Sequence, residues 1–220
     1  MRHKFEYTVY DSKRIIGKEF ERIATDPLWP FTISMSEENV YLQTKACDGK
    51  PLLKRPEEIS AALLHHIKTL SEQYQSKILD EVVITIPSEF SKKQKEATKT
   101  AAEMAGWKTI HFIPEPVAAA FAYFMEIEIP NQSNILICDC GGGTVDICIA
   151  KVINDRINVL AFNGDSYLGG RDFDKVLYNH FNAILKHKYG INVKDSNRKY
   201  ILNQQCQDIK HNLSTAFEDS

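Results

Sequence analysis

Apolar positions between residues 56 and 125 switch between the spacing of a helix and that of a strand. A helix is predicted to begin at Pro56, because proline suits the first helical position and acidic residues follow it in the first turn. Its apolar residues recur on one face at helical spacing: Ile59, Leu63, Ile67, Leu70 and Tyr74. The pattern then predicts a strand at 82–86, a helix capped by Ser91 and ending at Gly106, a strand at 109–113 and a helix at 115–125.

From residue 134 onward the pattern changes to consecutive strands followed by helices. Strands are predicted at 134–139, 144–153 and 156–162, between a linker candidate at Pro130–Ser133 and a turn rich in glycine and aspartate. The next helix is marked by Phe173, Val176, Leu177, Phe181, Ile184 and Leu185, and Gly190 stops it. A last helix is expected from Asp195 or Ser196, with Leu202, Ile209 and Leu213 on its buried side. Before residue 55 the pattern supports only short strands at 31–34 and 39–45.

The most informative segment is NILICDCGGGTVDICIA at 134–150, in which two apolar strands flank three glycines. Consecutive glycines can adopt positive φ and allow a close approach, and bare N–H groups in such a turn form a concave anion site suited to a polyphosphate. Asp139 could hold a metal ion or orient a water, and Thr144 and Asp146 follow the glycines. The segment has neither the Lys-Ser/Thr ending of a P-loop nor the dinucleotide spacing of glycines. A glycine-rich hairpin without a ligand is the alternative.

Composition excludes several classes of function. The chain has 220 residues, 43% of them hydrophobic and 25% charged, and a formal net charge of −2, which gives no electrostatic reason to expect nucleic acid or an anionic membrane as partner. No apolar run is long enough for a membrane span and no signal-peptide pattern opens the sequence, so a cytoplasmic location is expected, with the nucleus as an alternative. The five cysteines are expected to be reduced thiols. Cys138 and Cys140 share a strand face, but no CxxC or histidine cluster supports a zinc site.

Longer segments resemble one known family. The glycine segment is similar to the second phosphate motif of the actin, sugar-kinase and heat-shock ATPase superfamily. Residues 81–124 and 163–181 resemble, more narrowly, the seventy-kilodalton heat-shock chaperone family, and TVYDSKRIIGKEF at 8–20 and PLWPF at 27–31 fit its earlier portion. These matches follow the family's order over nearly the whole chain.

The resemblance implies an α/β fold of the actin-like ATPase type, with RNase H-like lobes. It divides the chain into a small outer subdomain of the first lobe (1–54), the core of that lobe without its opening strands (55–129), the start of the second lobe with the phosphate hairpin (130–168) and the outer helical part of that lobe (169–220). The family's first phosphate loop would precede Met1, and its later adenosine motif is also absent. The chain is therefore expected to be a middle slice of a nucleotide-binding domain, with open sheet edges and marginal stability.

The resemblance also implies a site for ATP or ADP with Mg²⁺. Lys13 matches the catalytic lysine, Glu115 the acidic residue near metal and water, and Asp139 the metal-facing aspartate. By themselves, Lys13 would be a solvated surface residue and Glu115 a charge that suits a helix N-terminus. The remaining matches concern nucleotide contacts: Gly141, Gly142, Gly143 and Thr144 at the phosphates, Asp146 as a second acidic position or a structural residue, Gly169 and Gly170 at the cleft, and Lys210 and Ser214 at the adenosine.

Several residues depart from the family pattern. Arg171 and Gln207 stand where the family carries acidic residues, and His211 stands where an arginine stacks on the adenine. Pro114 replaces an asparagine, and His111 replaces a basic residue associated with the contact to J-domain co-chaperones. Losing a preorganised charge or donor typically costs about a hundred- to thousand-fold in rate, so little hydrolysis is expected.

Three functions therefore compete. The first is a nucleotide-binding part of a chaperone ATPase, with weak affinity and little turnover, whose partners would be a J-domain protein, a nucleotide-exchange factor or a client bound through a domain outside this chain. The second is a non-catalytic interaction module or the remnant of a truncated gene. The third, a sugar or acetate kinase, is disfavoured by the long matches at 81–124 and 163–181.

Overall fold

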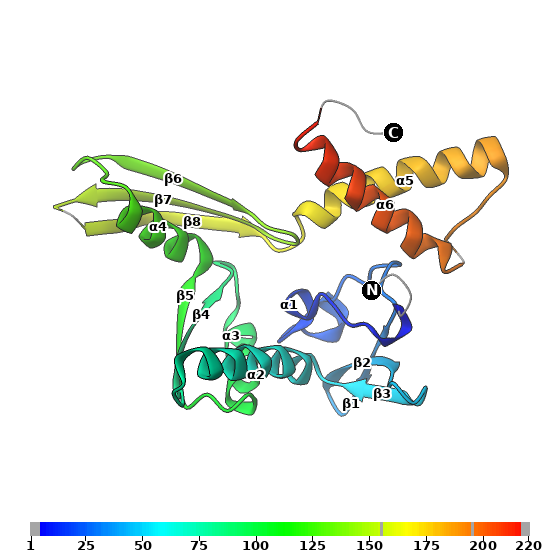
Figure 1. The fold of residues 1–220 in the computed structure, drawn as a ribbon, viewed down its shortest axis with the longest axis horizontal. Helices are drawn as coiled ribbons and strands as arrows, with labels where there is room; N and C mark the ends of the chain where they lie inside the picture. Colours follow the sequence, from blue (N-terminus) through cyan, green and yellow to red (C-terminus); the bar gives the residue numbers. More distant parts are fainter. Residues whose placement is uncertain (1–4, 155, 195, 217–220) are drawn as a thin grey trace.

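The computed structural model describes residues 5–154, 156–194 and 196–216, and it has the mixed α/β character that the sequence predicts (Figure 1). In chain order its elements are η1 Phe5–Tyr7, α1 Ser12–Ile15, η2 Phe20–Arg22, β1 Thr32–Ser36, β2 Asn39–Lys45, β3 Pro51–Lys54, α2 Pro56–Gln75, β4 Glu81–Ile86, α3 Lys92–Met104, β5 Thr109–Pro114, α4 Glu115–Glu126, β6 Asn134–Cys140, β7 Val145–Ile153, β8 Arg156–Asp165, α5 Gly170–Tyr189 and α6 Arg198–Leu213. Within the described residues the strands form three separate sheets, ordered β1-β2-β3, β4-β5 and β6-β7-β8.

The first sheet is antiparallel and covers a small core. Thr32 lies opposite Gln43, and Leu42 lies opposite Lys54. The core beneath it consists of Ile15, Ile23, Trp29, Phe31 and Leu42, so the short helix α1 and the loop after it are held by burial of apolar side chains. The two expected strands are confirmed, and β3 is an addition because four residues that include a proline carry almost no periodic signal.

The second group combines α2 and α3 with the parallel pair β4-β5, in which Glu81 lies opposite Thr109. The Ser91 side chain accepts a hydrogen bond from the N–H of Gln94 at 3.3 Å, which confirms the predicted cap of α3. In α2, the apolar face expected from the periodicity is largely exposed, and Tyr74 reaches 92% relative exposure. The residues that α2 buries are Pro56, Ala61 and Lys68.

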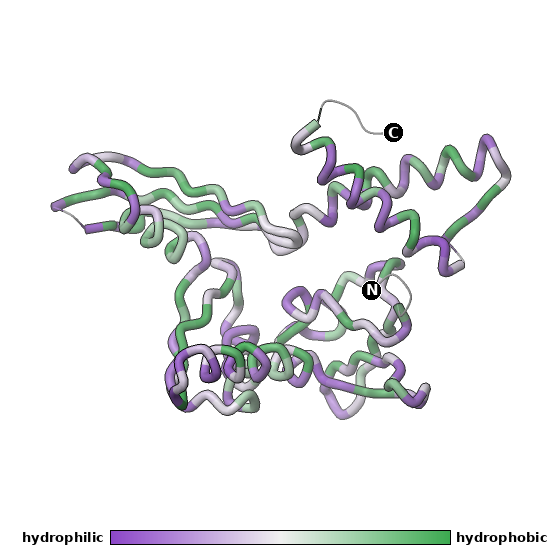
Figure 2. The backbone as a smooth tube through the Cα atoms, in the orientation of Figure 1, coloured by the Kyte–Doolittle hydropathy of each residue, from purple (hydrophilic) through white to green (hydrophobic). Residues whose placement is uncertain are grey.

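The third group is the antiparallel sheet β6-β7-β8 with α4 beside it (Figure 1). Alternate residues of β7, namely Cys148, Ala150 and Val152, are buried, so the sheet has one covered face. Large apolar residues on other positions of the sheet stay exposed, and Figure 2 shows hydrophobic residues along much of its length. Strand β8 continues to Asp165, beyond its predicted end at residue 162.

The fourth group is the helix pair α5–α6. Gly190 adopts φ +66° and ends α5 as predicted. The pair packs through Tyr178, Val193 and Cys206, with Leu28 from the N-terminal segment against this cluster. Helix α6 begins at Arg198, two residues after Ser196, and Asp195 lies outside the described residues.

Two expectations about these helices fail. Leu213, the last residue of α6, is exposed instead of buried. Phe173 and Val176 of α5 are also exposed, and the helix buries Asp174, Tyr178 and Asn182 instead. None of the described helices has the length and apolar character that a membrane crossing requires.

Candidate functional site

The glycine turn joins β6 to β7 and lies next to the start of α5 (Figure 1). The N–H of Gly141 donates to the carbonyl of Thr144 at 2.9 Å, which closes the turn. The three glycines do not use the positive φ that glycine permits, because the described glycines with positive φ are Gly17, Gly49, Gly106 and Gly190. Close approach concerns Gly143 alone among the three: a Cβ there would lie 2.9 Å from an Arg171 nitrogen and 3.2 Å from Arg14 Nε, whereas a Cβ on Gly142 would meet nothing within 4 Å.

The first turn of α5 docks onto the glycine turn. The N–H of Gly170 donates to the carbonyl of Gly141 at 2.9 Å, and the N–H of Arg171 donates to the carbonyl of Gly142 at 2.9 Å. A Cβ on Gly169 would lie 2.5 Å from the backbone nitrogen of Gly143, so the two backbones are in direct contact. The N–H groups at the start of α5, which have no partner inside the helix, are thus bonded to the carbonyls of the glycine turn. The predicted site residues 141–143 and 169–170 therefore lie in contact.

The carbonyls of the turn therefore accept hydrogen bonds from other parts of the protein, whereas some of the turn's donors form none. In the described part of the chain, the N–H groups of Gly142 and Gly143 have no acceptor, and the Thr144 hydroxyl has no hydrogen-bond partner. Backbone N–H groups of a turn that have no acceptor within the protein are the usual donors to a phosphate.

An arginine from the N-terminal segment fixes the turn from the other side. Arg14 donates to the carbonyl of Gly143 from Nε at 2.9 Å, across 129 residues of sequence, and its guanidinium pairs with Asp172 at 2.8 Å. Arg171 forms an ion pair with Asp11, which is almost fully buried and also accepts a hydrogen bond from Trp29 Nε1 at 2.9 Å. Sequence reasoning missed Arg14, Asp11 and Asp172, whose only signal was their position beside predicted site residues.

The predicted catalytic pair is brought together. Lys13 Nζ lies 2.6 Å from Glu115 Oε1, although 102 residues separate them in the sequence. Glu115 is the first residue of α4, and Lys13 directly precedes Arg14, the residue that binds the carbonyl of Gly143. Lys13 is about half exposed, and its charge is neutralised by Glu115.

The two strand aspartates lie opposite each other. Asp139 of β6 pairs in register with Asp146 of β7, and directly opposite residues of an antiparallel pair project from the same face. Asp146 is 2% exposed and accepts a hydrogen bond from the N–H of Ser88 at 2.9 Å, so it has a structural role. Asp139 is half-buried and, among the described residues, makes no hydrogen bond or ion pair with Lys13 or Glu115.

The predicted adenosine contacts on α6 are engaged inside the helix pair. Lys210 Nζ lies 2.6 Å from Asp174 Oδ1 and donates to the carbonyl of Gly170 at 2.8 Å. The Ser214 hydroxyl donates to the carbonyl of Lys210 at 2.9 Å. His211 is exposed. The side-chain polar atoms of Lys210 and Ser214 thus already have partners within the protein.

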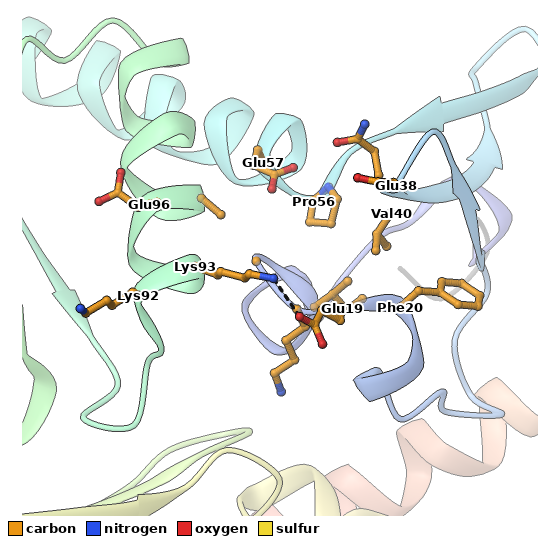
Figure 3. Close-up of a pocket in the computed structure, with 14 residues that line it drawn as sticks. Glu19, Phe20, Glu38, Val40, Pro56, Glu57, Lys92, Lys93 and Glu96 are labelled. Carbon is orange, nitrogen blue, oxygen red and sulfur yellow. Dashed lines mark hydrogen bonds and ion pairs between the residues drawn. The ribbon is translucent and has the colours of Figure 1, made fainter.

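Of two cavities in the described structure, the smaller borders this site. The larger, of about 440 Å³, lies among the η2 segment, β2, α2 and α3, where Lys93 pairs with Glu19 at 2.8 Å (Figure 3). None of the predicted site residues lines it. The smaller, of about 250 Å³, lies between the N-terminal segment and α5–α6, and both Arg14 and Arg171 line it.

Metal binding by protein ligands alone has no support in the described part of the chain, where no group of three or more histidine, cysteine or acidic side chains is placed to hold an ion. All five cysteines are free, with Cys148 and Cys206 buried and the other three exposed. The described part of the structure therefore offers no support for a zinc site at Cys138 and Cys140.

Comparison with known proteins identifies similar chains. The family model described as "Hsp70 protein" matches residues 2–220. A "Heat shock cognate HSP70 protein" of Trypanosoma brucei brucei is 34% identical over 212 residues, which cover 94% of this chain and 31% of that protein. A "Heat shock 70 kDa protein BIP3" of Oryza sativa subsp. japonica is 35% identical over 211 residues, which cover 94% of this chain and 32% of that protein. The chain thus spans about a third of the length of these curated relatives.

Proposed function

The chain belongs to the Hsp70 family and has the actin-like ATPase fold of that family's nucleotide-binding domain, and from this premise we propose that it binds the phosphates of Mg-ATP or Mg-ADP at the glycine turn. The observation that carries the proposal is the set of free donors at Gly142, Gly143 and Thr144. Arg14 and Arg171 place two guanidinium groups beside the turn, each paired with an aspartate, Asp172 and Asp11 respectively. Backbone N–H groups combined with guanidinium groups are a strong environment for a polyphosphate.

Magnesium fits the same place through the two strand aspartates. Asp139 and Asp146 project from one face at directly opposite positions, where two like charges repel each other. Mg²⁺ is commonly held by one or two carboxylates together with phosphate oxygens, and this arrangement needs no dedicated cage of protein ligands. Asp139 is the proposed ligand, because Asp146 is already tied to the N–H of Ser88.

Hydrolysis is proposed to be slow. Lys13 would supply positive charge to the terminal phosphate and Glu115 would orient the attacking water, but the two side chains are bound to each other at 2.6 Å. The pair must separate before either group can act, which opposes the stabilisation of the transition state. Bound Mg²⁺ would supply neutralisation of the phosphate charge, and the protein residues would position the phosphates and the water.

Isothermal titration of the intact chain with ADP and ATP, with and without Mg²⁺, tests the proposal. Binding that requires Mg²⁺ and is lost in Asp139→Ala, but kept in the exposed control Glu128→Ala, is the expected result. Absence of heat in a sample that circular dichroism shows to be folded would refute nucleotide binding. Equal loss in both variants would mean that Asp139 has no specific role.

A second function is favoured by the exposed apolar face of α2. Leu63, Ile67 and Leu70 are exposed together with Tyr74, and such a patch is typical of a contact with another protein. In this proposal the chain is an interaction module whose partners are a J-domain protein, a nucleotide-exchange factor or a client, without nucleotide turnover. The same titration separates the two functions, because a folded module that binds no nucleotide supports the second.

A further inference from the structure

Tyr167 joins the turn between β8 and α5 to the N-terminal segment. Its hydroxyl accepts a hydrogen bond from Lys18 Nζ at 2.8 Å and donates to the carbonyl of Arg22 at 3.3 Å. These two partners lie 149 and 145 residues away in the sequence, and neither belongs to the proposed phosphate site. Tyr167 therefore connects two segments that the course of the chain does not hold together.

Two cations also lie over the Tyr167 ring. Lys18 Nζ is 4.2 Å from the ring centroid, and the guanidinium carbon of Arg14 is 5.9 Å from it. Both distances fall within the roughly 6 Å over which an aromatic face attracts a cation. The side chain therefore uses its ring as well as its hydroxyl. We call the contacts of Tyr167 with Lys18, Arg22 and Arg14 the tyrosine clasp.

Through Arg14 the tyrosine clasp reaches the glycine turn. Arg14 donates to the carbonyl of Gly143 from Nε at 2.9 Å. Gly143 also meets the backbone of Gly169, two residues after Tyr167, where an added Cβ would lie 2.5 Å from the Gly143 nitrogen. The contacts thus form a closed ring that runs from Tyr167 through Arg14 and the glycine turn and back along the β8–α5 turn.

The tyrosine clasp is exposed, whereas the site that it borders is held more firmly. Tyr167 is 41% exposed, and solvent-exposed contacts of this kind open locally at a small free-energy cost. The Arg14 side chain is 11% exposed and has bonds to Gly143 and Asp172 that do not involve Tyr167. The first turn of α5 has its own hydrogen bonds to the glycine turn as well. Opening of the clasp would therefore move the β8–α5 turn and leave the phosphate donors in place.

We propose that the tyrosine clasp is a gate that sets the rate at which a phosphate ligand reaches and leaves the glycine turn. The inference rests on the proposed function, and it concerns rates instead of affinity. In the closed form the Tyr167 ring lies against the guanidinium that binds Gly143, whose N–H has no acceptor in the described part of the chain. The clasp adds no bond to the ligand whether open or closed, so its loss should speed entry and exit by the same factor and leave the affinity unchanged.

Stopped-flow kinetics of the intact chain with Mg-ADP that carries a methylanthraniloyl fluorophore measure both rates. We expect Tyr167→Ala to raise the association and dissociation rate constants about tenfold each, or ~1.4 kcal/mol in the barrier, with Kd changed by less than about twofold. Tyr167→Phe keeps the ring and loses both hydroxyl bonds, so its rate constants should lie between those of the parent chain and Tyr167→Ala. Tyr189→Ala removes a ring that is 59% exposed and has Lys188 Nζ 5.5 Å from its centroid, and it should behave as the parent chain does.

Hydrogen exchange without nucleotide tests the tyrosine clasp by itself. Backbone amides of residues 18–22 and 165–168 should exchange faster in Tyr167→Ala than in the parent chain, because the contacts that join these segments are lost. Tyr189→Ala should leave exchange in both segments unchanged. Exchange that is equally slow in Tyr167→Ala would show that the clasp does not hold the segments together and would overturn the gate.

The kinetic outcomes separate a gate from other roles of Tyr167. Unchanged ADP rate constants in Tyr167→Ala would overturn the gate and leave nucleotide binding intact. A faster dissociation alone, with weaker affinity, would make Tyr167 a structural support of the site and would overturn the gate as well. No binding of the labelled ADP to the folded parent chain would refute both the proposed function and the gate. Tyr167→Phe provides the same tests if the alanine variant fails to fold, with a smaller expected change.

Discussion

Two junctions hold the chain together, and they differ in chemistry. The junction of α2 and α3 with β4-β5 is apolar and buries residues such as Ile86, Phe90 and Ala101. The junction between the N-terminal segment and α5 consists mainly of charge pairs: Asp11 with Arg171, Arg14 with Asp172, and Asp26 with Lys175. The candidate site lies at the second junction.

This difference explains where binding is expected. Apolar burial depends little on salt, whereas ion pairs are screened in proportion to their exposure, which in this junction is small for Arg14 and larger for Lys175. A junction made of charges can open or rearrange at a smaller free-energy cost than a packed core, and ligand sites are commonly drawn from such less stable regions. The same arginines that close the junction would also meet the phosphates.

The largest expected effect on stability comes from a buried position of β4, and an exposed position of the same strand serves as its matched control. Ile86→Ala, at a position 3% exposed, should lower the free energy of unfolding by about 2–5 kcal/mol, because it leaves a cavity in the apolar junction. Val83→Ala, at a position 62% exposed in the same strand, should change it by less than about 0.5 kcal/mol. Urea unfolding followed by circular dichroism measures both, and equal effects would contradict the assignment of this core.

Thiol labelling compares buried with exposed positions within one residue type, cysteine. Burial, with a smaller contribution from Asp174, raises the pKa of the Cys206 thiol from 9.0 to about 11, and burial also raises the pKa of Cys148. A raised thiol pKa means less reactive thiolate, so near pH 8 Cys206 should react about a hundredfold more slowly than a thiol of ordinary pKa. Mass spectrometry after brief labelling should find Cys47, Cys138 and Cys140 modified first; early modification of Cys206 would show that the α5–α6 core opens readily.

Charge reversal tests the second junction. Arg171→Glu would place a carboxylate beside Asp11, which is 4% exposed, and we expect a loss of about 1–3 kcal/mol together with faster hydrogen exchange in residues 8–14. Arg198→Glu makes the same reversal at an exposed position and should have almost no effect. Similar exchange in both variants would mean that the Arg171–Asp11 pair does not hold the junction.

The smallest effect is expected at the outer pair. Lys175 lies 3.3 Å from Asp26 and is more exposed than Arg14, so Lys175→Ala should cost less than about 1 kcal/mol, and 0.5 M NaCl should remove most of that difference. Unfolding of both proteins with and without salt measures it. A loss that survives high salt would assign to Lys175 a packing role through its methylene groups.

Prediction from the sequence worked best where a signal is local. The cap at Ser91, the stop at Gly190 and the strands around the glycine turn depend on residues a few positions apart, and all are present. The conformation of the turn itself did not follow from the sequence, because three glycines permit positive φ without requiring it. The close contacts at Gly143 come from Arg14 and from Arg171 of α5, which no local pattern could reveal.

The sequence by itself determined the helices, the strands, the glycine turn and the family, because these follow from periodicity, capping residues and motifs along a continuous stretch of chain. Only the tertiary structure decided that Lys13 meets Glu115, that Arg14 binds Gly143 and that Arg171 pairs with Asp11. It also decided which apolar faces are covered, as the exposed face of α2 shows. The physical reason is that burial and charge pairing join residues more than a hundred positions apart, and their partners are set by packing of whole elements.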